Sequence, residues 1–138
     1  MRREDWFERM SEVVAAHQNV PFQYGKSDCL RFPLECVTAM TGETFDLPNY
    51  KTEGGAAKAL MKAGFISVGD ALASRFQEIP PAFAGRGDLV EAVNGNQVAG
   101  GVCVGMEVVC KTEAGNVLPP RSAIRPAFRA RHAHPPRS

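Results

Sequence analysis

The spacing of apolar residues changes once along the chain, at the Pro80-Pro81 pair. Before it, apolar residues recur every three or four positions, which is the period of an amphipathic helix. After it, short valine-rich runs are separated by glycine or by Asn94-Gly95, a strong two-residue hairpin signal. Helices followed by an antiparallel meander predict an α+β fold, with N-terminal helices packed on a C-terminal antiparallel sheet. A chain of 138 residues with 44% hydrophobic residues suits one domain with one core.

Local signals place the elements. We expect helices over 3–17, from about 27 to a stop at Gly42, over 52–64 with Thr52 as cap, and for a turn or two within 69–76. We expect strands over 88–93, 98–104, 106–111 and 116–118. Pro33 leaves two starts open for the second helix: a regular helix from about Arg31, or an irregular one from Cys29, capped by Ser27 or Asp28.

Arginine dominates the end of the chain. Residues 119–138 contain no acid and five arginines, namely Arg121, Arg125, Arg129, Arg131 and Arg137. With these set aside from the 16 Lys+Arg, 11 basic residues face 15 acidic ones, so the net charge of +1 combines an acidic body with a basic end. We therefore expect a domain over residues 1–118 and a Pro/Arg-rich C-terminal arm over 119–138, in which Arg121, Arg125, Arg129 and Arg131 bind a partner protein.

The same composition excludes several function classes. The nearly balanced charge argues against a dedicated nucleic-acid binder, and no apolar run approaches the roughly 18 residues of a membrane span. The chain does not open on a basic segment followed by an apolar one, and its four cysteines form no Cys-x-x-Cys pair. We therefore expect reduced thiols in a protein made in the cytoplasm.

The cysteines differ in their surroundings. Cys36 and Cys103 lie in apolar patterns typical of a core, whereas Cys29 follows a Gly-Lys-Ser-Asp turn at the expected helix start. Free backbone N–H groups there, with Lys26 and Arg31, would stabilise a Cys29 thiolate, and Asp28 would oppose it. The i, i+7 spacings of Cys29 with Cys36 and of Cys103 with Cys110 leave a four-thiolate site open. Zinc ligands are usually spaced much more closely, so we expect no metal and no cofactor.

Two motifs resemble those of a known family. Phe22-x-Tyr24-Gly25-x-x-Asp28-Cys29-x-x-Phe32, followed by Arg86-Gly87-Asp88-Leu89-Val90, resembles the NlpC-type branch of papain-like cell-wall cysteine peptidases. More closely, the chain up to Phe128 is similar to a relative of that branch found in phage and prophage tail gene clusters. Shared features are the Trp6 helix, the Tyr50-x-Thr52-x-x-Gly55-Ala56 helix start, Gly64-Phe65 and the Gly-Val-x-x-Gly hairpin over 101–105. The resemblance implies a papain-like (NlpC-type) fold.

The resemblance also implies roles for individual residues. Cys29 stands at the position of the nucleophile, Tyr24 at that of a site-lining tyrosine, and Asp28 directly before the nucleophile. The general base of the family is a histidine in a His-Val-Gly-Ile-like strand, and Ala99 occupies its place here. The residue that orients this histidine falls near Cys110 or Lys111, and neither is a customary orienter.

The missing histidine separates two functional hypotheses. A thiol without an adjacent base is mostly protonated at neutral pH, and the loss of a positioned acid–base group typically costs about 10²- to 10⁴-fold in rate. We therefore expect a structural or interaction protein of a phage tail or tail tip that has lost catalysis and docks on a larger tail hub protein. The alternative is an active cysteine peptidase or amidase that degrades peptidoglycan, with a base recruited from His17, His132 or His134, or from the partner.

Overall fold

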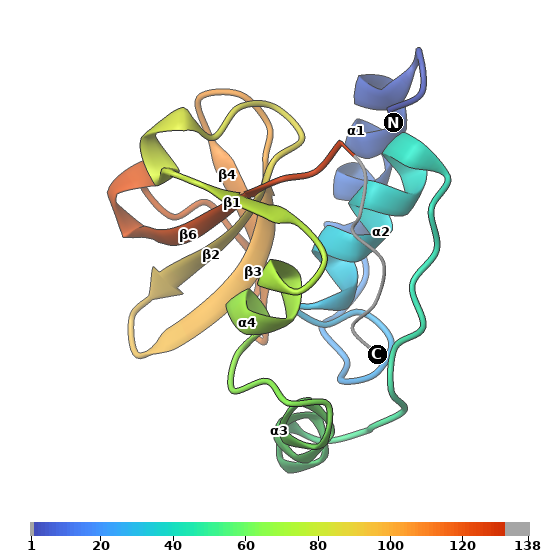
Figure 1. Ribbon diagram of the computed structural model, residues 1–138, viewed down its shortest axis with the longest axis vertical. Helices are drawn as coiled ribbons and strands as arrows, with labels where there is room; N and C mark the ends of the chain where they lie inside the picture. The colour runs from blue at the N-terminus through green and yellow to red at the C-terminus, as the bar shows by residue number, and fades with distance from the viewer. Residues whose placement is uncertain (1, 132–138) are drawn as a thin grey trace.

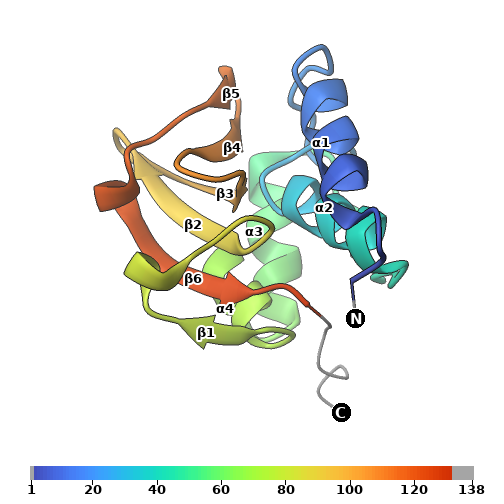
Figure 2. The same ribbon diagram turned by 90° about the horizontal axis from the view of Figure 1, so that it is seen from above.

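Four helices precede a six-stranded antiparallel sheet in the computed structural model, which describes residues 2–131. The helices are α1 (Trp6–His17), α2 (Arg31–Thr41), α3 (Glu53–Lys62) and α4 (Val68–Ala73). The strands are β1 (Gln77–Ile79), β2 (Leu89–Asn94), β3 (Gln97–Cys103), β4 (Val108–Thr112), β5 (Gly115–Val117) and β6 (Ile124–Arg129). In Figures 1 and 2, α1 and α2 lie together beside the sheet, and Figure 1 shows α3 apart from them at one end of the molecule. The predicted α+β order of helices and strands is confirmed.

The second helix begins where Pro33 allows it to begin. Because α2 starts at Arg31, Pro33 lies in the first turn, where its missing N–H removes no intrahelical hydrogen bond. Gly42 ends the helix in the left-handed region, with a φ of 83° that glycine adopts at little cost. The regular start near Arg31 is therefore the correct one of the two alternatives.

The sheet carries an apolar cluster on each face. Its strand order is β1-β6-β2-β3-β4-β5, and neighbouring side chains along a strand point to opposite faces. The first cluster joins the sheet to α1 and α2 and includes Met10, Phe32, Met40, Leu89, Val102 and Phe128. The second cluster includes Val90, Ala92, Ala99, Val108 and Ala127. The first cluster fixes the start of α2 against the sheet, and this positions the turn that carries Cys29.

The end of the chain is part of the sheet and not an arm. β6 lies between β1 and β2 and is hydrogen-bonded to both, and Phe128 is fully buried. The expected boundary at residue 119 is therefore wrong for the residues up to Arg129. Pro126 hides the strand in the sequence because proline cannot donate to a ladder. The β2–β6 register shifts between Val90 and Ala92, opposite the segment that contains Pro126, so the proline sits in an irregularity of the ladder.

The remaining secondary-structure predictions differ little from the structure. The expected strands correspond to β2, β3, β4 and β5, and Asn94 pairs with Gln97 across the Asn94-Gly95 hairpin. Thr52 caps α3 by accepting the Gly55 N–H at 3.0 Å. The three-residue strand β1 was not predicted. None of the helices formed by residues 2–131 has the length and apolarity needed to cross a bilayer.

The position of β6 between two other strands makes a mutational prediction. Phe128→Ala should lower the free energy of unfolding by about 3–5 kcal/mol, because it removes a buried aromatic ring and leaves a cavity. Leu118→Ala, at a side chain that is 60% exposed, should change it by less than about 0.5 kcal/mol. Urea denaturation followed by circular dichroism measures both. Equal, small effects at the two positions would contradict the assignment of β6 to the sheet.

Candidate functional site

The Asp28 carboxylate organises the turn before α2. Its Oδ1 accepts hydrogen bonds from the backbone N–H groups of Leu30 and Arg31, at 3.1 and 2.9 Å. Its Oδ2 accepts the Gly25 N–H at 2.9 Å and the Tyr50 hydroxyl at 2.7 Å. Asp28 is almost fully buried, so these four donors replace the water that the charge has lost. The carboxylate joins the turn, the first residues of α2 and the segment before α3.

Close approach of two chain segments explains the glycine of this turn. Gly25 has a φ of +84°, and a Cβ added there would lie 1.9 Å from the backbone oxygen of Tyr50. No side chain fits that space without moving the backbone. Ser27 completes the turn by donating its hydroxyl hydrogen to the Pro21 carbonyl at 2.6 Å. The Tyr-Gly-x-x-Asp-Cys sequence therefore has a structural explanation that requires no catalysis.

Cys29 faces a small pocket between this turn and the sheet. The pocket has a volume of about 260 Å³ and is lined by Cys29, Tyr24 and Ala99, together with Glu53, Lys111 and Glu113. The structure thus brings Cys29 and Tyr24 together with Ala99, the residue at the expected base position. Asp28 does not line this pocket, and its carboxylate is used within the turn.

The environment of Cys29 favours the protonated thiol. Burial, with a smaller contribution from the negative charge of Asp28, raises the pKa of Cys29 to about 11, although the backbone N–H of Gly100 opposes the rise. The α2 N–H groups of Leu30 and Arg31 that could stabilise a thiolate are bonded to Asp28 instead. The expected activation of Cys29 by the helix start and its neighbouring cations is therefore wrong. A thiol with this pKa is almost entirely uncharged at neutral pH.

The polar groups around the pocket have other partners. Lys111 Nζ donates to the His17 carbonyl at 2.9 Å and to the Val20 carbonyl, and burial lowers the pKa of this amine. Tyr24 donates its hydroxyl hydrogen to Glu113 Oε1 at 2.6 Å. Burial, and then this hydrogen bond, raise the pKa of Tyr24, so its hydroxyl remains protonated. Lys111, Tyr24 and Glu113 are thus engaged with other groups, and the Glu53 carboxylate also lines the pocket.

His17, the one histidine within residues 2–131, does not replace the missing base. His17 Nε2 lies 3.0 Å from Glu35 Oε2, and its ring packs on Phe32 with a centroid separation of 4.8 Å. Within residues 2–131, no histidine nitrogen is hydrogen-bonded to Cys29. The other two candidates, His132 and His134, lie outside the described residues.

The other three cysteines belong to the interior. Cys36, Cys103 and Cys110 are buried, and all four cysteines are free. Cys103 Sγ donates to the Gly105 carbonyl at 3.2 Å, and Cys110 lies in the second apolar cluster. Among residues 2–131, His, Cys, Asp and Glu side chains form no group of three or more that could hold a metal ion.

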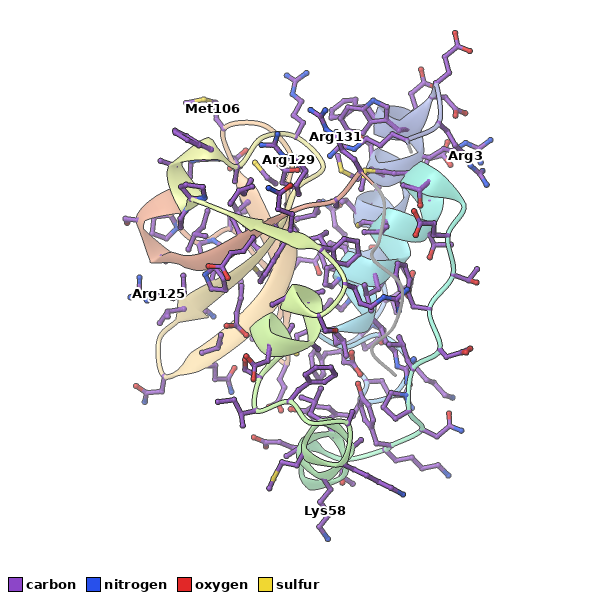
Figure 3. The ribbon with its side chains drawn as sticks, in the orientation of Figure 1. Arg3, Lys58, Met106, Arg125, Arg129 and Arg131 are labelled. Carbon is purple, nitrogen blue, oxygen red and sulfur yellow. The ribbon has the colours of Figure 1, made fainter. Side chains whose placement is uncertain are left out.

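The C-terminal arginines do not form one docking element. Arg121 is half-buried, and its guanidinium donates to the Ala84 carbonyl at 2.7 Å and contacts Cys103 Sγ at 3.3 Å, which gives it a structural role that the sequence does not predict. Arg125 is exposed at one end of β6, whereas Arg129 and Arg131 lie at the other end. Figure 3 shows this separation. Arg137 is outside the described residues.

Comparison with known families gives one result. A family model described as Domain of unknown function (DUF6950) matches residues 1–130. The chain belongs to this family. The DUF6950 match extends through β6, which agrees with a domain that ends near residue 130 and not at residue 118. Among the curated proteins, none matches the chain.

Two polar residues of this region have roles that the sequence reasoning missed. Tyr50 entered only as part of a helix-start motif, yet its hydroxyl holds the Asp28 carboxylate. Glu91 is buried in β2 and accepts the Gly69 N–H of α4 at 2.7 Å; burial raises its pKa, and this hydrogen bond opposes the rise. An acid inside the Leu-Val-Glu-Ala-Val run was a visible signal for Glu91. No sequence signal linked Tyr50 to Asp28.

The four hydrogen bonds of Asp28 predict a large effect on stability. Asp28→Ala should lower the free energy of unfolding by at least about 3 kcal/mol, because hydrogen bonds to a charged group contribute about 1.5–3 kcal/mol each. Asp46→Ala, at an exposed acid of the neighbouring segment, should change it by less than about 0.5 kcal/mol. Guanidinium denaturation monitored by Trp6 fluorescence measures both. If Asp28→Ala were as mild as its control, Asp28 would not organise the turn.

Proposed function

We propose that this chain is a non-catalytic module with a papain-like, NlpC-type fold that serves as a structural or interaction component of a phage tail or tail tip. The proposal combines the motif resemblance with the chemistry of the Cys29 pocket. The motif places the cysteine, the tyrosine and the preceding aspartate in their family order. Among residues 2–131, however, the pocket lacks the histidine that the family's hydrolysis reaction uses as its base.

One observation carries the proposal. Cys29 and Ala99 line one pocket in which the described residues include no histidine, and burial raises the pKa of Cys29 to about 11. Attack on a peptide carbonyl requires the thiolate, and departure of the amine requires a proton donor. With a pKa of about 11, Cys29 is almost entirely a neutral thiol at neutral pH, and Ala99 leaves the position of the family's acid–base histidine empty of any proton-transfer group. The Asp28 turn has a structural role even without catalysis, because the Asp28 carboxylate holds α2 to the segment before α3.

A working cysteine hydrolase is the second candidate, and one contact favours it. The backbone N–H of Gly100 acts to lower the pKa of Cys29, which favours the thiolate as a backbone donor in a catalytic site would. This candidate also needs a base from outside residues 2–131, either from the end of the chain or from a partner. It therefore predicts activity in the assembled state.

The two candidates differ in an assay of cleavage. Full-length protein and Cys29→Ala should release products from peptidoglycan and from short cell-wall peptides at the same background rate, because no thiolate attacks. An active NlpC-type peptidase serves as the positive control, and the assay is repeated with purified tail particles that contain the protein. Cleavage that disappears in Cys29→Ala would establish the hydrolase. If mass spectrometry detected none of this protein in purified tail particles, the tail assignment would be refuted.

A further inference from the structure

Arginines and aromatic rings gather where the two ends of the described chain meet. Arg2 lies over the Trp6 ring at 4.2 Å from its centroid, and Arg86 lies over the Phe7 ring at 5.1 Å. Arg2 Nε also donates to the Ala130 carbonyl at 3.3 Å, which places the N-terminal segment beside Arg131. This surface thus combines the start of α1, the loop before β2 and the end of β6.

The surface continues to the β3–β4 turn. A Cβ added to Gly105 would lie 3.5 Å from Arg86 Nε, and Met106 follows directly. Figure 3 places Met106, Arg129 and Arg131 at the same end of the molecule, opposite Lys58 on α3. We call the set Arg2, Trp6, Phe7, Arg86, Met106 and Arg131 the arginine–aromatic face.

Positive charge on this face is incompletely compensated. Asp88 Oδ1 lies 3.4 Å from Arg2, but the Asp88 carboxylate is buried and also accepts the Gly85 and Ala130 N–H groups. Within residues 2–131, neither Arg86 nor Arg131 forms an ion pair. Burial lowers the pKa of Arg2, Asp88 raises it, and the charges of Arg131 and Arg129 lower it. Arg131 and Arg129 therefore each lie close enough to Arg2 to repel its guanidinium, and a bound anion would relieve that repulsion.

Apolar side chains lie among these charges. Phe7 is 38% exposed, and Met106 is 88% exposed. Their sequence neighbours Glu8 and Glu107 are exposed acids. A continuous phosphate backbone would meet both acids, whereas a protein segment can place an apolar side chain on Phe7 and Met106 and its carboxylates on the arginines.

We propose that the arginine–aromatic face docks an acidic segment of a partner protein that carries an exposed apolar side chain. The proposal rests on the interaction role proposed above and supplies the chemistry of the partner. Of the four arginines expected to bind a partner, this face includes Arg131 but not Arg121, Arg125 or Arg129. It adds Arg2 and Arg86. Charged residues at the edge of a protein interface mainly determine the association rate and its dependence on salt. Burial of the partner's apolar side chain against this face would add affinity.

Trp6 makes the test direct, because it is the one tryptophan of the chain and lies under Arg2. The probe is a synthetic peptide with one phenylalanine between two runs of glutamate, titrated into full-length protein at low salt. A second peptide replaces the phenylalanine with serine, and a short DNA duplex is titrated in parallel. Arg86→Ala/Arg131→Ala removes two charges from the face. Lys58→Ala/Lys62→Ala removes two from exposed positions on α3 and is the matched control.

The expected result is saturable binding of the phenylalanine peptide that weakens on the order of tenfold in Arg86→Ala/Arg131→Ala, because each exposed ion pair contributes only a modest free energy. Binding should be unchanged in the α3 variant, weaker for the serine peptide and weaker at high salt. No binding, equal binding by the two double variants, or tighter binding of the duplex would each overturn the proposal. Mass spectrometry of the same samples detects peptide cleavage, which would refute the non-catalytic function separately.

Discussion

The buried carboxylate of Asp28 is the interaction on which the candidate site depends. Four donors from four residues converge on it, and they come from the turn before α2, from α2 itself and from the segment before α3. A buried charge is tolerated only when it is fully hydrogen-bonded, so the geometry of this turn is narrowly defined. Gly25 adds a steric condition, because its backbone touches that of Tyr50. The site is therefore positioned by a polar contact between segments, supported by the apolar cluster under α2.

The same carboxylate opposes the chemistry that the motif suggests. It occupies the N–H groups at the start of α2, and its charge acts on the adjacent thiol. An active site built on this turn would need a cation, such as a neighbouring imidazolium, to reverse the effect on Cys29. Ala99 supplies none. Asp28 thus stabilises the turn and adds to the rise in the Cys29 pKa that burial mainly causes.

The sequence predicts local features well and long-range ones poorly. Pro33, Gly42, Thr52 and Asn94-Gly95 act through the backbone within a few residues, so their effects could be predicted. β6 could not be predicted, because Pro126 and the neighbouring arginines conceal the strand in the sequence. The β2–β6 ladder accommodates Pro126 where its register shifts. The hydrogen bond from Arg121 to Ala84 and the bond from Tyr50 to Asp28 depend on contacts between distant segments. The pKa of Cys29 depends mostly on burial, which a motif does not encode.

The titration of Cys29 tests the central claim most directly. The Cβ carbon of ¹³C-labelled cysteine reports thiol ionisation in NMR spectra, and the Cys29→Ser variant assigns the signal. A midpoint near pH 11 is predicted for the wild-type protein, with a lower midpoint in Asp28→Asn because the negative charge is gone. A wild-type midpoint below about 8, as in activated cysteines, would contradict the account.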